Sequence, residues 1–166
     1  MSTLTLTKWD TDKLELMIRD IGVAMITTLA PNGTLHSRPM AAPKHAFDGD
    51  LWFFTAADSL KAHEVAENSH VNVSFSEPKS ERYISISGRA SVVHDHARAE
   101  AMWTPLLRGW FPGGVDDPRL ALLRVEVEHA EYWDAKGSRM LVFFSLAKAA
   151  TTGHAPKHLG SHANLG

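Results

Sequence analysis

A lysine and two hydroxyl side chains stand where a predicted aromatic strand passes into a predicted helix over residues 60–67. Thr55 ends the strand, and Ser59 and Lys61 flank the start of the helix. The first backbone N–H groups of a helix have no internal partner and carry partial positive charge, so they suit a phosphate. Lys61 would add a full charge, and the hydroxyls would donate hydrogen bonds. The spacing predicts an anion site; the alternative is that Ser59 or Asp58 only caps the helix and Lys61 is solvated.

Arg38 supplies a second positive charge on another predicted strand, over residues 34–41. Side chains alternate along a strand, so His36, Arg38 and Met40 should share one face. Pro39 cannot donate a ladder hydrogen bond, which places this strand at a sheet edge or breaks it locally. Arg38 is therefore either a surface charge or a ligand contact.

Two further sets of residues attract attention by type. Trp110 and Phe111 lie in a predicted loop that runs into Pro112-Gly113-Gly114, and two large aromatics in a loop suggest a pocket or an interface. Histidines recur every fourth residue in the segment 151–166 (His154, His158 and His162), a spacing that would align metal ligands on a helix. Pro156 and Gly160 within that segment argue against such a helix, so we expect a mobile C-terminal tail and no metal site.

The elements that would position these residues follow from periodicity. Asp12 and Glu15 resemble a capping box ahead of an apolar stripe that ends at Gly22. Asn32-Gly33 is a strong hairpin signal, and Gly88 indicates a bulge in a long alternating strand. Strands are expected over 23–29, 34–41, 51–55, 70–75, 82–93 and 120–133, and helices over 13–21, 60–67, 95–104 and 139–150.

About six strands joined mostly by hairpins predict a mainly β, α+β fold: a closed or nearly closed antiparallel barrel with peripheral helices. Small barrels fill their interior with side chains, so a ligand would bind on the outer wall or between two subunits. We expect residues 1–150 to form one domain, followed by the tail 151–166.

Composition excludes several classes of protein. The chain has 166 residues and a formal net charge of −2, which argues against a general nucleic-acid binder. Its apolar runs are shorter than the ~18 residues needed to span a bilayer, and the N-terminus does not resemble a secretory signal. Cysteine is absent, so thiol chemistry is excluded. We expect a cytoplasmic protein that binds neither nucleic acid nor membrane.

Six short segments follow one another behind the N-terminal helix: His36-Ser-Arg-Pro-Met40, Gly49-Asp-Leu-Trp-Phe-Phe-Thr55, Asp58-Ser-Leu-Lys61, Val71-Asn-Val-Ser74, Tyr83-Ile-Ser-Ile-Ser-Gly88 and Trp110-Phe-Pro-Gly-Gly114. In this order they resemble the pyridoxamine 5′-phosphate oxidase-like family, and most closely its general stress protein branch. The resemblance covers about residues 10–150. It implies a split β-barrel, a homodimer, and a flavin, usually FMN with FAD as the alternative, held between the subunits.

The resemblance also implies roles for individual residues. Arg38 matches the arginine that meets the flavin phosphate, and Thr55, Ser59 and Lys61 match the hydroxyls and lysine near it. Met40 and the run Trp52-Phe53-Phe54 match strand positions that pass the flavin ring and ribityl chain, and Pro39 is expected to contact the cofactor beside Met40. Trp110 would cover the partner's groove or the dimer seam.

Two departures from the family pattern bear on activity. Leu60 replaces the first member of the family's Arg-Lys pair, and the C-terminal Arg-x-His substrate pocket has no match. The function is therefore either flavin binding without a dedicated substrate or flavin-dependent oxidoreduction, in which His36, His63 and His70 are acid–base candidates by type only. A haem- or deazaflavin-binding split barrel is a third alternative. Catalytic residues are not assigned, and oxidation of pyridoxamine 5′-phosphate is not expected.

Overall fold

The computed structural model describes residues 8–42, 47–134 and 161–165 of the chain. In chain order its elements are α1 (Lys8–Ile18), β1 (Val23–Leu29), β2 (Leu35–Ala41), β3 (Asp50–Ala56), α2 (Leu60–Glu67), β4 (His70–Glu77), β5 (Arg82–Val93), α3 (His96–Met102), two short 3-10 turns (Pro105–Gly109 and Gly114–Asp116), β6 (Leu120–Asp134) and β7 (Ser161–Leu165).

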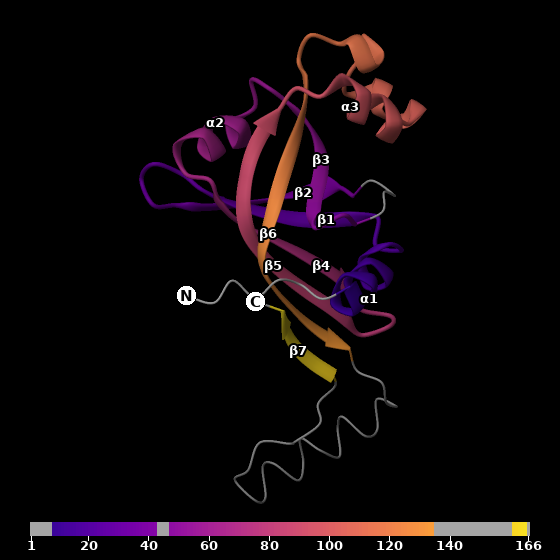
Figure 1. Cartoon of the computed structure of the whole chain (residues 1–166). Coiled ribbons are helices and arrows are strands. Elements are labelled where there is room, and N and C mark those ends of the chain that lie inside the picture. The colour runs from indigo at the N-terminus through magenta and orange to yellow at the C-terminus, as the bar shows by residue number, and fades with distance from the viewer. Residues whose placement is uncertain (1–7, 43–46, 135–160, 166) are drawn as a thin grey trace, which may run out of the picture.

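All strands belong to one antiparallel sheet with the order β2-β1-β4-β5-β6-β3, and β7 adds to the far half of β6. The sheet curls so that β1 and β2 lie across the back of β5 and β6 (Figure 1). Its two end strands, β2 and β3, do not pair with each other. This is the predicted split barrel of six antiparallel strands with peripheral helices.

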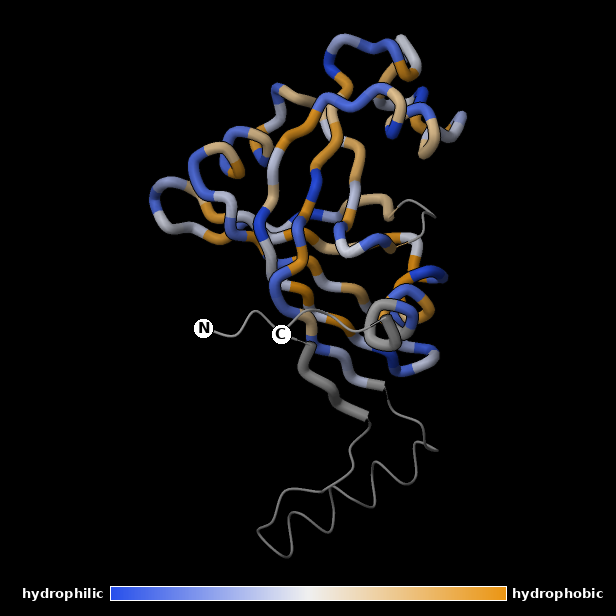
Figure 2. Tube along the Cα trace, in the orientation of Figure 1, coloured by the Kyte–Doolittle hydropathy of each residue, from blue (hydrophilic) through white to orange (hydrophobic). Residues whose placement is uncertain are grey.

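Alternation of apolar and polar residues explains which face of each strand is buried, as the tube coloured by hydropathy shows along β5 and β6 (Figure 2). On β5, Ile84 and Ile86 are buried while the neighbouring hydroxyls Ser85 and Ser87 face outward. The register with β6 shifts between Ser87 and Gly88. A Cβ at Gly88 would collide with the backbone carbonyl oxygen of Glu126, so the predicted bulge is confirmed and requires glycine.

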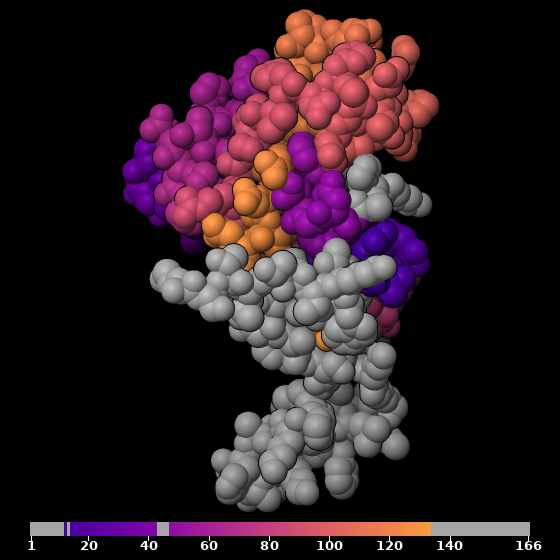
Figure 3. Space-filling model, viewed as in Figure 1, coloured from indigo at the N-terminus to yellow at the C-terminus, as the bar shows by residue number. Residues whose placement is uncertain are grey.

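β3 is covered on both faces, and the described residues on its two sides form two hydrophobic clusters. Phe53 lies in the large cluster inside the curled sheet, together with Leu14 of α1. Phe54 lies on the other face, against a smaller cluster that includes Phe111, and its ring meets that of Trp103 edge-on with centroids 6.0 Å apart. The segment carrying α3 and the 3-10 turns stands at one end of the molecule over this second face (Figure 3).

Three local predictions are corrected. α1 begins at Lys8 rather than after Asp12, because the Asp12–Glu15 pattern also fits a helix interior. The expected loop after α3 forms 3-10 turns and buries Phe111, whereas Trp110 stays exposed. Five residues of the expected tail, Ser161–Leu165, form β7 on β6 instead. The expected helix over 139–150 and the rest of the tail lie outside the described residues.

Candidate functional site

A cavity of about 330 Å³ lies between the two end strands of the sheet, β2 and β3, which do not pair with each other. β2 and β3 form two of its walls, Lys61 of α2 reaches it from a third side, and the first 3-10 turn and its flank close it from a fourth. Its lining residues are Pro39, Met40, Ala41, Phe54, Thr55, Ala56, Lys61, Leu107, Trp110, Phe111 and Arg119. The lining is largely apolar, with two cations.

The start of α2 has the geometry of a capped helix. The Ser59 side chain accepts a hydrogen bond from the backbone N–H of Ala62 at 3.4 Å. The Ser59 hydroxyl also lies 3.2 Å from that of Thr55, at the end of β3. Ser59 thus caps the helix, as the simpler interpretation of the sequence expected, and joins the helix start to the cavity wall.

Lys61 faces the cavity without a counter-ion. It is half-buried, and no hydrogen bond or ion pair involves its ammonium group within the described part of the chain. Burial and then the charge of Arg38 lower the pKa of Lys61 below its usual value. A partly desolvated cation beside a second cation gains more from a bound anion than an exposed lysine would.

Arg38 lies on β2 close to this lysine, but two nitrogens of its guanidinium already donate hydrogen bonds within the protein. Nη1 donates to Thr28 Oγ1 at 2.8 Å, and Nη2 donates to Glu64 Oε2 at 2.9 Å. Thr28 Oγ1 in turn donates to Glu64 Oε2 at 2.5 Å, and His36 Nδ1 lies 2.5 Å from Oε1. Glu64 therefore gathers three side chains from β1 and β2 beneath α2.

The carboxylate of Glu64 is ionised despite being only 2% exposed. Burial, the largest contribution, would raise the pKa of Glu64, but the hydrogen bonds from Thr28, His36 and Arg38 and the charge of Arg38 outweigh it. Together they lower the pKa to about 2. The Glu64–Arg38 pair is thus a partly buried ion pair that joins α2 to β2.

Arg119 is a cavity residue that the sequence alone did not indicate. Its Nη2 donates to the backbone carbonyl of Trp110 at 3.1 Å, which ties the turn carrying Trp110 to the start of β6. Asp117 accepts hydrogen bonds from the backbone N–H groups of Arg119 and Gly113, and these lower the pKa of Asp117. This side of the cavity is therefore held by a turn with its own polar contacts.

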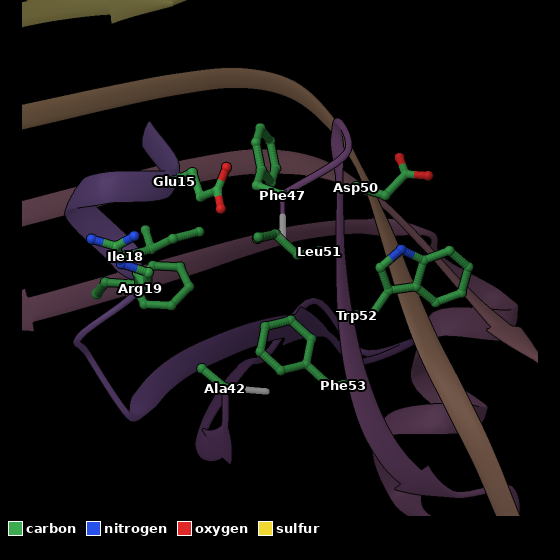
Figure 4. A pocket seen from close by; sticks show the side chains of 10 residues that line it. Glu15, Ile18, Arg19, Ala42, Phe47, Asp50, Leu51, Trp52 and Phe53 are labelled. Carbon is green, nitrogen blue, oxygen red and sulfur yellow. The ribbon is translucent and has the colours of Figure 1, made fainter. Parts of the chain in front are cut away.

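Six of the nine predicted cofactor-binding residues line the cavity: Pro39, Met40, Phe54, Thr55, Lys61 and Trp110. Ser59 and Arg38 adjoin it through Thr55 and Lys61. Phe53 is the one predicted residue whose side chain lies away from the cavity, because side chains alternate along β3. Trp52 and Phe53 point to opposite sides of the strand (Figure 4), and Phe53 is 1% exposed in the core.

Two other hollows fit a cofactor less well. The one between α1 and β3, shown in Figure 4, has a volume of about 40 Å³, too small for a ring system. A hollow of about 530 Å³ lies over the outer sheet face beside Asn72 and Ser87, and its floor carries no cation among the residues that line it. Across the described ranges, no three His, Asp or Glu residues are grouped to hold a metal ion, and no helix is long and apolar enough to cross a membrane.

Comparison with known proteins gives a consistent result. Residues 10–157 match the family model described as pyridoxamine 5′-phosphate oxidase like. Protein bli-3 of Neurospora crassa is 33% identical over 117 residues, which cover 65% of this chain and 56% of that protein. The chain therefore spans little more than half the length of that relative.

Solved structures share the fold. A general stress FMN/FAD binding protein from Xanthomonas citri is 31% identical and has a TM-score of 0.67, with 80% of this chain and 93% of that one covered. A general stress protein 26 homologue from Jannaschia sp. CCS1 is 24% identical and has a TM-score of 0.70, with 93% and 96% covered. The second likeness concerns the fold alone.

Proposed function

Since the chain belongs to the pyridoxamine 5′-phosphate oxidase-like family, we propose that it binds a flavin in the cavity between β2 and β3, with the phosphate on Lys61. FMN is the flavin that we favour, and FAD is the alternative. The similar Xanthomonas citri protein is described as binding FMN/FAD. Flavin binding is the function that this site supports best, and a cytoplasmic location and a role in stress are further parts of the proposal.

The observation that carries the proposal is Lys61. It combines partial burial, a lowered pKa and the lack of a counter-ion among the described residues with a place at the edge of a cavity. Thr55 and Ser59 bring hydroxyls to the same end, beside the N-terminus of α2. A phosphate bound there would pair with the charge of Lys61 and accept hydrogen bonds from the hydroxyls of Thr55 and Ser59.

The rest of the cavity suits the ring system. Met40 and Leu107 supply apolar surface, and Phe54 and Trp110 supply aromatic surface. When bound, the flavin supplies redox chemistry, while these residues bind and orient it and keep water from one side.

The proposal includes a second subunit that completes the site. Trp110 is 66% exposed and Leu106 is 82% exposed beside the cavity, and Leu60 at the start of α2 is also exposed. Large apolar side chains grouped around an open cavity favour burial against a partner. Light scattering should give about twice the chain mass of 18.3 kDa. A monomer that still binds flavin would contradict the two-subunit site.

Binding without a dedicated substrate is favoured over oxidoreduction. The described residues that line the cavity include no histidine, aspartate or glutamate that could transfer a proton. His36 contacts Glu64, and His63 contacts the backbone oxygen of Ser59, so neither faces the cavity wall. The same lining offers no axial histidine to a haem.

An absorbance spectrum of the purified protein tests the proposal directly. We expect flavin bands either as isolated or after adding FMN and removing the excess. With pyridoxamine 5′-phosphate as substrate, we expect no more than one turnover per flavin. A Soret band, or no retained chromophore after incubation with FMN, FAD or riboflavin, would refute the flavin assignment.

A further inference from the structure

Glu64 occupies an unusual place for a carboxylate beside a proposed phosphate site. It lies one turn after Lys61 on α2, and its side chain turns under the helix toward β2. Both of its oxygens accept hydrogen bonds, and one of them holds Arg38 at 2.9 Å. A negative charge so close to an anion site weakens anion binding there, so the position of Glu64 calls for an explanation.

The charges near the phosphate end of the cavity compensate one another. Arg38 contributes one positive charge, and the ionised Glu64 contributes one negative charge at hydrogen-bond distance. Arg38 is 22% exposed, so solvent screens the pair only in part. Arg119, the other cation of the lining, lies 3.8 Å from Asp117 through its Nε. What remains for an incoming phosphate is therefore close to the single charge of Lys61.

We propose that Glu64 is a specificity-determining residue that offsets the charge of Arg38, so that Lys61 alone selects the phosphate of the flavin. The inference rests on the proposed function. Arg38 then serves mainly to hold α2 on β2, and the protein binds its flavin less tightly than two free cations would allow. Such a site favours exchange of the flavin over permanent retention.

The substitution E64Q tests this, because glutamine keeps the shape and one hydrogen-bond acceptor while removing the charge. FMN and riboflavin differ only in the phosphate, and each is titrated separately. Both titrations are run at the same pH, so that the contact between His36 and Glu64 is the same in both. We expect FMN to bind about five- to tenfold more tightly to E64Q than to the parent, and riboflavin within about twofold. The gain in FMN affinity should shrink at high salt.

The double variant R38Q/E64Q removes both charges together and leaves neither one buried alone, so it serves if E64Q does not fold. We expect its preference for FMN over riboflavin to stay within about threefold of the parent's. The control is E67Q, which removes an exposed negative charge from the same helix and should leave the preference for FMN unchanged.

Two results would overturn the inference: weaker FMN binding by E64Q, or a double variant that loses the preference for FMN as fully as K61Q does. The first would mean that Glu64 positions Arg38 as a direct phosphate ligand. If the parent protein shows no preference for FMN, or if K61Q retains it, the proposed phosphate site itself fails. The two failures are therefore distinguishable.

Discussion

Lys61 and Glu64 lie one turn apart on the same short helix, yet their surroundings are opposite. Glu64 is buried and accepts hydrogen bonds from Thr28, His36 and Arg38, which join α2 to two strands. Lys61 is half-buried, has no ion pair in the described structure, and faces a cavity. The charge of Glu64 has its partners within the fold, whereas that of Lys61 is available to a ligand.

This difference separates a structural charge, that of Glu64, from one that we propose to be functional, that of Lys61. Both residues have lowered pKa values, but for different reasons: partners stabilise the ionised form of Glu64, whereas burial and Arg38 destabilise the ionised form of Lys61. A protein gains stability from the first arrangement and loses some through the second. Unsatisfied charges that persist at a cavity are candidates for ligand binding.

The largest effect expected from this comparison is on stability. Glu64→Ala should lower the free energy of unfolding by about 3 kcal/mol or more, because Arg38 loses its buried partner. Lys61→Ala should change it by less than about 0.5 kcal/mol. Chemical denaturation of both variants measures the contrast; equal losses would show that both charges are structural.

Lowering the pH should remove the contribution of the ionised Glu64 to the stability of the parent protein. The folded pKa of Glu64 is lowered from 4.5 to about 2, so its ionised form stabilises the fold above pH 4.5. That stabilisation, on the order of 3 kcal/mol, should be lost as the pH falls toward 2. The midpoint of denaturant unfolding, measured across this pH range, gives the slope of stability against pH. E64Q should show a shallower slope, and an unchanged slope would assign the acid sensitivity to other carboxylates.

A smaller effect should appear in alkali. Lys61 loses its charge below the usual pKa of 10.5, so FMN affinity should fall about three- to tenfold as the pH rises toward that value. Riboflavin binding controls for titration of the flavin ring, which both ligands share. If FMN and riboflavin weaken in parallel, the loss does not come from Lys61.

Much of the fold could be predicted because its signals are local. The bounds of β1 follow from the Asn-Gly turn after it, those of α2 from its capping serine, and those of β5 from the alternation of its residues. Thr55, Ser59 and Lys61, the residues of the proposed anion site, also lie within seven positions of one another, so their proximity needed no tertiary information. The Gly88 bulge was visible as a glycine in an otherwise regular strand.

The residues that were missed depend on contacts between distant parts of the chain. Glu64 meets Arg38 across 26 positions and Thr28 across 36, and nothing in a short helix shows which polar residue turns inward. The one available signal was the shared face of His36 and Arg38 on β2. Arg119 follows a proline in a turn, and only the folded structure brings it to the cavity.

The central claim is that Lys61 holds the phosphate of a bound flavin. Its most direct test compares the dissociation constants of FMN and riboflavin for the parent, for K61Q, and for K79Q, which removes an exposed lysine from the turn between β4 and β5. We expect K61Q to weaken FMN binding by about 1.5–3 kcal/mol and to leave riboflavin binding nearly unchanged, with K79Q like the parent. Equal losses for FMN and riboflavin, or no loss for either, would contradict the account.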